Sequence, residues 1–403
     1  MMSNNKKQIL KKLYPEDMFQ YSLGLTEGEI EVLQHTREII EKELRPVIND
    51  HWDAATFPFD EFYKLADAGI MNNPKLFVGR ENTRKPSQLY NFFLYYELAR
   101  FDASIATFYT VHGGLGYNTI LIGGDARQIE EFAPKVESFE WQTAFALTEP
   151  DHGSDIAGGL ATTAKRDGEN WIINGEKRWI GGADTADIIP VFARDVEDGK
   201  IKAFMVRKGA KGYQADPIPQ KTSLRPVQNA HITMEDVVVP ETDRLQNING
   251  FSDVAKILVN TRADVAHIAT GVTGGAYSAA LAYVKEREQF GKKISQFQIT
   301  QEKLARMQAN TTAAIGYSTR LAEMLEEGDY DMTRSSLAKM HNSLVMRDTV
   351  SLAREVVGGN GITLSTDVAR HFADAEGIYT YEGTHEINAL IVGRTITGSG
   401  AFV

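Results

Sequence analysis

Cysteine is entirely missing from the sequence, which excludes disulfide bridges, thiolate metal sites and cysteine nucleophiles. Long apolar runs are missing as well. The longest charge-free stretch, residues 265–284, contains His267 and several glycines, so it is too polar for the roughly 20 apolar residues that a membrane span needs. The chain ends resemble neither a secretory signal peptide nor a peroxisomal tripeptide. We therefore expect a cytoplasmic protein without a membrane span.

Positive charge is also in short supply, because the formal net charge is -11 and the sequence pI is about 5.4. This balance argues against non-specific nucleic-acid binding. A strand followed by Gly-x-Gly-x-x-Gly and a helix is absent, which excludes a Rossmann nicotinamide site. The Walker A, His-Glu-x-x-His and EF-hand patterns are absent too, and we expect no metal site.

Three regions of different texture follow one another along the 403 residues. Residues 1–144 show helical periodicity, residues 145–251 show a period of two with turn residues, and residues 252–403 are helical again. This order predicts an α+β protein with an N-terminal α-helical domain, a middle β domain and a C-terminal helical bundle.

Local signals refine the helical regions. Thr26 and Glu29 have the spacing of a capping box, and Pro46 is expected to end or kink the helix that follows them. Residues 87–100 are rich in aromatics and predict a buried helix. The glycines of residues 112–116 resemble an oxyanion-hole loop, but without a Gly-x-Ser-x-Gly elbow they favour a close helix contact. Three long helices are predicted further on, over residues 252–289, 296–327 and 333–357.

In the middle region, Asp167-Gly168 and Asn174-Gly175 are both hairpin signals. Further strand-like runs cover residues 187–193, 201–206 and 231–239. Many short strands with turns between them predict a small barrel or sandwich.

Near the C-terminus, Glu382 stands between Tyr381 and Gly383, directly before a helix that Thr384 is suited to cap. A carboxylate at this place, beside a glycine that lets a ligand approach the backbone, suits a general base. By itself it equally suits an ordinary acidic residue near a helix N-terminus.

Four other segments have unusual residue choices, each with a structural alternative. Residues 145–155 place Thr148 and Ser154 on irregular backbone, which suits either a polar ligand or a domain-boundary turn. Trp179, in residues 176–182, suits either a flat aromatic ring or the core. Arg287 suits either a pyrophosphate or a helix-capping turn. The glycines of residues 355–361 suit either a ligand's close approach or a helix cap.

Together these segments resemble the acyl-CoA dehydrogenase family over residues 26–402. Five motifs occur in the family's order: Leu147-Thr-Glu-Pro150 with Gly153-Ser-Asp155, Asn174-Gly with Lys177-x-Trp-Ile180, Arg287-x-x-Phe-Gly291, Gly358-Gly-Asn-Gly361, and Tyr381-Glu-Gly-Thr384. The resemblance implies the acyl-CoA dehydrogenase-like fold, with a middle β-barrel domain and a C-terminal four-helix bundle. The middle domain and the bundle would hold FAD between them.

The resemblance also assigns residues to the cofactor and the substrate. Residues expected near FAD in the same subunit are Phe145, Leu147, Thr148, Ser154, Trp179, Ile180, Gly181, Thr384 and Glu386. Those expected to reach the FAD of a neighbouring subunit are Arg287, Phe290, Gln298, Glu355, Gly358 and Gly359, which implies a dimer or, as we expect, a homotetramer. Residues expected to contact the acyl-CoA are Ser154, Arg262, Tyr381 and Gly383.

For the chemistry, the resemblance makes Glu382 the base that removes the α-proton of the thioester, with its pKa raised when substrate excludes water. Some relatives carry the base on the helix that contains Arg262, at the position of Thr261. A threonine cannot serve as the base there, which favours Glu382. Glutaryl-CoA dehydrogenases bind a substrate carboxylate at positions that are Ala99 and Ala106 here. The substrate is therefore expected to be a short or medium acyl chain without a carboxylate.

Three interpretations of the function remain open, and the first two differ in the electron acceptor. Gly181 stands where many dehydrogenases have threonine, and plant peroxisomal short-chain acyl-CoA oxidases share this glycine as well as similarity over residues 171–180 and 225–229. Electrons would pass to an electron-transferring flavoprotein in a dehydrogenase but to oxygen in an oxidase. The third interpretation is a non-catalytic CoA-binding or scaffold protein on the same fold.

Overall fold

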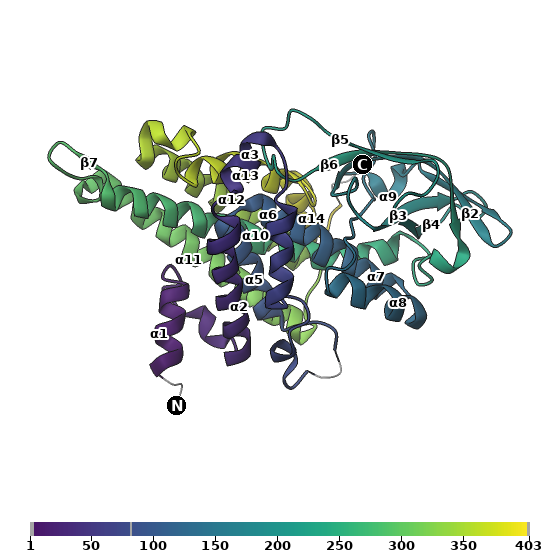
Figure 1. Cartoon of the computed structure of the whole chain (residues 1–403), viewed down its shortest axis with the longest axis horizontal. Helices are drawn as coiled ribbons and strands as arrows, with labels where there is room; N and C mark the ends of the chain where they lie inside the picture. Colours follow the sequence, from purple (N-terminus) through teal and green to yellow (C-terminus); the bar gives the residue numbers. More distant parts are fainter. Residues whose placement is uncertain (1–3, 81–82, 401–403) are drawn as a thin grey trace.

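The computed structural model describes residues 4–80 and 83–400. Helices come first along the chain, strands follow, and long helices end it, which confirms the predicted order (Figure 1). The helical bundle lies at one end of the molecule's long axis and the sheet at the other. No helix in the described ranges is long and apolar enough to cross a membrane.

The N-terminal part is built from eight α-helices within the described residues: α1 (Asn4–Leu13), α2 (Glu27–Ile39), α3 (Ile48–Ala54), α4 (Phe59–Tyr63), α5 (Gln88–Phe101), α6 (Ala103–Tyr109), α7 (Tyr117–Gly123) and α8 (Ala126–Glu137). The predicted capping box is present. The Thr26 side chain accepts a hydrogen bond from the Glu29 backbone N–H, and the Glu29 side chain accepts one from the Thr26 backbone N–H. The helix ends before Pro46, in a π-helical turn over Ile40–Leu44. Helix α5 is buried along nearly its whole length, as predicted.

The middle part contains the short helix α9 (Ile156–Gly159) and one six-stranded sheet. Its strands are β1 (Thr163–Asp167), β2 (Asn170–Gly181), β3 (Ile188–Asp195), β4 (Ile201–Arg207), β5 (Tyr213–Pro217) and β6 (Asn229–Pro240), in the spatial order β4-β3-β1-β2-β6-β5. The Asp167-Gly168 hairpin joins β1 to β2, as predicted. Strands β4 and β5 are the two ends of this order, so the expected barrel is open between them.

The hairpin predicted at Asn174-Gly175 is wrong. Both residues lie inside β2, where the register to β6 shifts by a bulge. Asn174 exchanges hydrogen bonds with Asp236 across the strands instead of turning the chain. Gly175 is required because a Cβ there would lie 2.7 Å from Cα of Thr162. Pairing with the neighbouring strands has therefore overridden a local turn signal.

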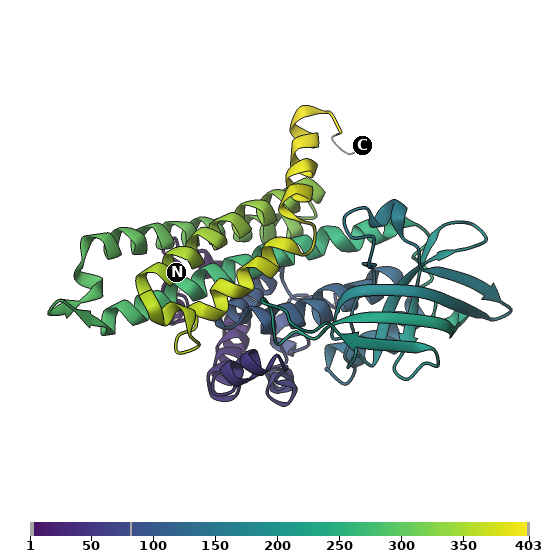
Figure 2. The same cartoon turned by 90° about the horizontal axis from the view of Figure 1, so that it is seen from above.

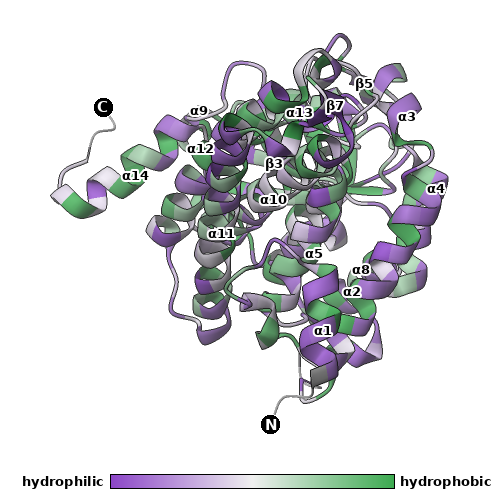
Figure 3. Cartoon of the chain, turned by 90° about the vertical axis from the view of Figure 1, so that its left-hand side faces the viewer, coloured by the Kyte–Doolittle hydropathy of each residue, from purple (hydrophilic) through white to green (hydrophobic). Residues whose placement is uncertain are grey.

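The C-terminal part is a bundle of α10 (Phe251–Glu286), α11 (Gln298–Glu327), α12 (Met332–Val357) and α13 (Val368–Thr380), with the small hairpin β7 (Glu288–Gln289) and β8 (Lys292–Lys293) at its tip. The charge-free stretch is a buried part of α10, where Gly271 allows close packing on α5. Helix α14 (His385–Thr397) projects away from the bundle (Figure 2). Its hydrophobic residues are visible in Figure 3, and Ile387, Leu390 and Ile391 are only partly buried.

Candidate active site

Glu382 lies in the turn between α13 and α14, where the chain leaves the bundle. Its φ is 54° and that of Gly383 is 81°, so two consecutive residues adopt the left-handed conformation. A left-handed glutamate costs roughly 1–2 kcal/mol, which the surrounding contacts must offset. A Cβ on Gly383 would lie 3.1 Å from the Asn388 amide nitrogen. The backbone of this turn thus demands a glycine and fixes the direction of the Glu382 side chain.

The Glu382 carboxylate points to α10. The Thr261 hydroxyl donates a hydrogen bond to Glu382 Oε1 over 2.7 Å. Burial raises the pKa of Glu382 above its usual 4.5, against the opposing effects of Arg262, the Thr261 hydrogen bond and Lys339. A carboxylate with a raised pKa is a stronger base than one in water, as a proton-abstracting group requires.

Arg262 brings a cation to the same place. Its side chain is almost buried, and a Cβ on Gly383 would lie 3.5 Å from the Arg262 Nε. Within the described residues, that Nε has no hydrogen-bond partner. Burial lowers the pKa of Arg262, and the neighbouring Glu382 opposes this shift. A buried donor without an acceptor is costly, so this N–H is available for an oxygen of a ligand.

Tyr381 anchors the turn to the N-terminal helices. Its hydroxyl lies 3.1 Å from the Thr107 hydroxyl of α6, and burial raises the pKa of the phenol well above its usual range. On the other side of the turn, Thr384 caps α14 by accepting from the Ile387 N–H, as predicted. Glu386 is exposed in the first turn of α14. Glu382, Gly383 and Arg262 are therefore brought together by α10, α13 and α14.

A second group of predicted residues lies at the edge of the middle domain. Lys177 is fully buried and donates to the Leu147 carbonyl over 3.1 Å and to Glu149 over 2.8 Å. Glu149 also accepts from the backbone N–H groups of residues 161 and 162. The Thr148 carbonyl accepts from the Arg178 N–H at 2.8 Å, so residues 147–149 run beside β2. Phe145 packs on Phe192 below them.

Trp179 is displayed rather than buried. The register of β2 shifts between Lys177 and Ile180, and Trp179 has a φ of 67°. This irregularity turns the indole out of the sheet, and 53 % of the residue is exposed. The Arg178 guanidinium lies 5.2 Å from the ring centroid. An exposed, backbone-fixed indole suits a flat aromatic ligand better than the alternative core role.

The other predicted cofactor residues of the middle part differ in accessibility. Ile180 and Gly181, which follow Trp179 in β2, are buried, while Ser154 is exposed before α9. A Cβ on Gly181 would lie 3.1 Å from Cγ2 of Val111, so a larger side chain at this position requires Val111 to shift. Asn229, in the stretch shared with the plant oxidases, donates to the Trp179 carbonyl over 3.3 Å.

A third group lies at the other end of the bundle and does not meet Glu382 within one chain. It comprises the exposed residues Arg287, Phe290, Gln298, Glu355, Gly358 and Gly359. Phe290 is 94 % exposed, an unusual state for a phenylalanine. Glu355 pairs with Lys303 over 2.5 Å, and this cation lowers its pKa.

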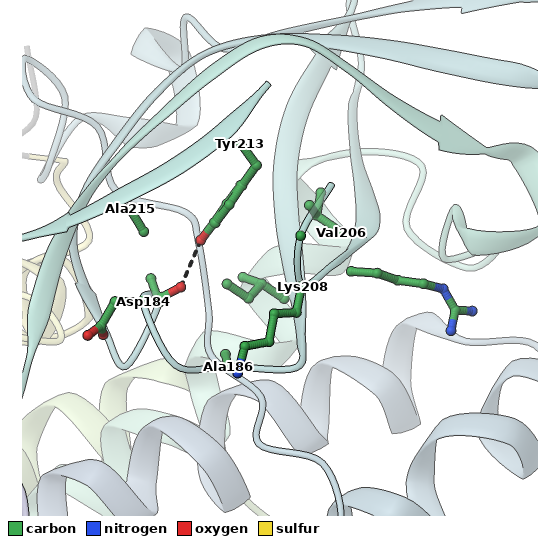
Figure 4. Close-up of a pocket in the computed structure, with 10 residues that line it drawn as sticks. Asp184, Ala186, Val206, Lys208, Tyr213 and Ala215 are labelled. Atoms are coloured by element: carbon green, nitrogen blue, oxygen red, sulfur yellow. Dashed lines mark hydrogen bonds between the residues drawn. The ribbon is translucent and has the colours of Figure 1, made fainter. Parts of the chain in front are cut away.

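The sequence does not predict the roles of three residues that support the site, which are Thr261, Glu149 and Lys177. In the sequence, Thr261 indicates only that a base is lacking at its position, and Glu149 and Lys177 stand out only as parts of motifs. Elsewhere in the middle domain, Asp184, Lys208 and Tyr213 line a cavity of about 200 Å³ that shares no residue with the predicted site (Figure 4).

Comparisons with known proteins agree with this architecture. Family models describing the N-terminal, middle and C-terminal domains of acyl-CoA dehydrogenases match residues 26–140, 144–237 and 249–397. The chain is 29% identical to a short-chain-specific acyl-CoA dehydrogenase of Clostridium acetobutylicum, over 93% of this chain and 99% of that protein. It is 31% identical to the CarC subunit of the caffeyl-CoA reductase–Etf complex of Acetobacterium woodii, over 88% and 94% of the two chains.

Among solved structures, a glutaryl-CoA dehydrogenase from Mycobacterium smegmatis in complex with FADH2 superposes with a TM-score of 0.89. It shares 29% identity and covers 96% of this chain and 99% of its own. The three domain models match in the family's order, and the relatives match over nearly their full length. Both findings assign the chain to one family. The chain belongs to the acyl-CoA dehydrogenase family.

Proposed function

We propose that this protein is an FAD-dependent enzyme that removes the α- and β-hydrogens of an acyl-CoA thioester and forms the trans-2-enoyl-CoA. The observation that carries this proposal is the arrangement of Glu382. Its carboxylate has a raised pKa, is oriented by Thr261, and lies beside a glycine turn and the unpartnered N–H of Arg262.

The role of each protein group follows from its contacts. Oε1 of Glu382 accepts from Thr261, which leaves Oε2 to take the α-proton. Arg262 provides a buried positive charge and a free donor for an oxygen of the acyl-CoA. The absence of a side chain at Gly383 lets the thioester approach the backbone. Holding the substrate's α-carbon close to a fixed base is positioning catalysis, and raising the base's pKa adds driving force.

The residues at the middle-domain edge fit a flavin. Trp179 offers an exposed indole, Thr148 lies beside the strand that carries it, and Ser154 offers an exposed hydroxyl before α9. Thr384 and Glu386 begin α14 on the other side. Bound FAD would supply the acceptor for the hydride that leaves the β-carbon.

The exposed group at the bundle tip supports a shared cofactor in an oligomer. We propose that Arg287, Phe290 and Gln298, with residues 355–359, serve the FAD of a second copy, in a homotetramer. The projecting helix α14, with partly exposed Ile387, Leu390 and Ile391, leaves apolar surface that a second copy would cover. We propose that the protein is located in the cytoplasm.

For the substrate, we propose a short or medium acyl chain without a terminal carboxylate. Ala99 and Ala106 are both fully buried, and their methyl side chains offer no hydrogen bond to a carboxylate. For the electron acceptor, we propose an electron-transferring flavoprotein, since a relative at 31% identity is named as part of an Etf complex. An acyl-CoA oxidase is the second candidate. It is favoured by Gly181, which lacks the threonine hydroxyl of many dehydrogenases and where a Cβ would lie 3.1 Å from Cγ2 of Val111, so that a threonine would require Val111 to shift.

The test uses purified holoenzyme and acyl-CoA esters of increasing chain length, scored for loss of flavin absorbance under argon. The Glu382→Gln variant is expected to retain FAD and bind acyl-CoA but to bleach its flavin about 10²–10⁴-fold more slowly, because the base is lost. Glu376→Gln, an exposed carboxylate on α13 outside the site, is the matched control. Full activity of Glu382→Gln would remove Glu382 from its role. Rapid peroxide release in air would identify the oxidase.

A further inference from the structure

Lys339, on α12, reaches the turn that carries Glu382. Its residue is fully buried, and its ammonium donates to the Tyr379 carbonyl over 2.8 Å and to the Gly383 carbonyl over 2.8 Å. The two acceptors lie on either side of Glu382 in the chain. One lysine therefore bridges the end of α13 and the start of the turn into α14.

Asn388, from the first turns of α14, holds the same carbonyl. Its amide donates to the Gly383 carbonyl over 2.8 Å and to the Thr384 carbonyl over 3.0 Å. The Gly383 carbonyl thus accepts from two buried side chains that belong to different helices. We call Lys339 and Asn388 the loop clamp. The clamp acts where Glu382 and Gly383 both adopt left-handed backbone, the conformation that needs support from its surroundings.

Burying a lysine ammonium at this position costs desolvation free energy, which argues against a merely space-filling role. Within the described residues, the Lys339 ammonium donates to the carbonyls of Tyr379 and Gly383 and to no carboxylate. Desolvation costs a buried ammonium several kcal/mol, and here it lowers the pKa of Lys339 to about 8. The charge is nevertheless retained beside Glu382, and it lowers the pKa of that carboxyl.

We propose that Lys339 is a positioning residue of the dehydrogenation reaction, which holds the Glu382 turn in its strained conformation through the carbonyls of Tyr379 and Gly383. This inference rests on the proposed role of Glu382 as the base. Lys339 acts through the backbone and one nearby charge, and it needs no contact with the substrate.

The test compares Lys339→Met, which keeps the length of the side chain but removes its donors and charge, with Lys339→Arg. Lys339→Met is expected to lower kcat about 10- to 100-fold with KM changed less than threefold, because a displacement of about 1 Å at a reacting group has a cost of this order. Lys339→Arg is expected to recover part of the lost kcat. Amide hydrogen exchange over residues 381–387 is expected to become at least tenfold faster in Lys339→Met.

The pH profile gives a readout that a purely structural lysine would not move. The groups facing the Glu382 carboxyl are Thr261, Arg262 and Asp264 on α10, Lys339 on α12 and the adjacent Tyr381. Removing only the Lys339 cation raises the pKa of Glu382, so the rising limb of kcat/KM is expected to move to higher pH.

Asn342→Ala is the matched control. Asn342 is fully buried on the same helix one turn away, but it binds Thr270 and Ser318 and not the turn. It is expected to lower thermal stability while keeping kcat, the pH profile and the exchange of residues 381–387. Wild-type kcat, pH profile and exchange in Lys339→Met, with Glu382→Gln inactive, would overturn the clamp alone. An active Glu382→Gln would instead overturn the proposed function.

Discussion

At the scale of the residue, opposing influences act on the carboxyl group of Glu382 and set its pKa. Burial favours the protonated form, while Arg262, Thr261 and Lys339 favour the carboxylate. Because burial has the larger effect, the pKa stands above 4.5. The proton abstraction that we propose for Glu382 needs the ionised form of the carboxyl group, so kcat/KM is expected to rise with pH through this raised pKa.

A Thr261→Val substitution tests this balance. It removes the 2.7 Å hydrogen bond that stabilises the carboxylate while keeping the shape of the side chain. The pKa of Glu382 is expected to rise, so the rising limb of the kcat/KM profile moves to higher pH. Thr270→Val, on the same helix but bonded to Ser318, is expected to leave the profile in place. A profile that shifts equally in both variants would contradict the assignment to the Glu382 contact.

At the scale of the element, β2 is the strand that connects the core of the sheet to the proposed flavin surface. Lys177 ties it to residues 147–149 inside the protein, and two residues later the strand shifts register and displays Trp179. Burial lowers the pKa of Lys177 to about 8, against the effect of Glu149. The buried pair sets the position from which the indole projects.

Replacing Lys177 by Met is expected to weaken both the fold and cofactor retention. The substitution leaves the Glu149 carboxylate buried without its cation, a loss of about 3–5 kcal/mol of unfolding free energy. Chemical denaturation and the ratio of flavin to protein after gel filtration measure the two effects. Lys165→Met, exposed on β1, is the control and is expected to change neither. Normal flavin content in a destabilised Lys177→Met protein would separate this pair from the flavin surface.

At the scale of the whole molecule, Asp374 joins all three parts of the chain. This buried carboxyl of α13 accepts from the Trp52 indole N–H over 3.2 Å and from the Leu224 backbone N–H over 2.6 Å. Burial and the nearby Asp102 raise its pKa to about 7. The same loop of the middle part reaches back to the N-terminal part, since Arg225 donates to the Trp52 carbonyl over 2.9 Å.

An Asp374→Ala variant is expected to lose about 3 kcal/mol of unfolding free energy, because the buried Leu224 N–H and the partly buried Trp52 indole N–H lose their acceptor. Denaturant unfolding measures this loss. Asp348→Ala, an exposed carboxylate of α12, is expected to change stability by less than about 1 kcal/mol. Equal stability of the two variants would show that Asp374 does not join the parts.

The sequence alone determined the order of helices and strands and the capped helix starts, and it singled out Glu382 as the proposed base, because these depend on periodicity and on motifs that are contiguous in the chain. Tertiary structure decided the rest. Asn174-Gly175 is a turn by local preference, yet pairing with β6 and the close approach of Thr162 place it within a strand. Lys339 would be a surface lysine on an isolated helix. Only the packing of α12 against the turn between α13 and α14 buries it against the two carbonyls beside Glu382.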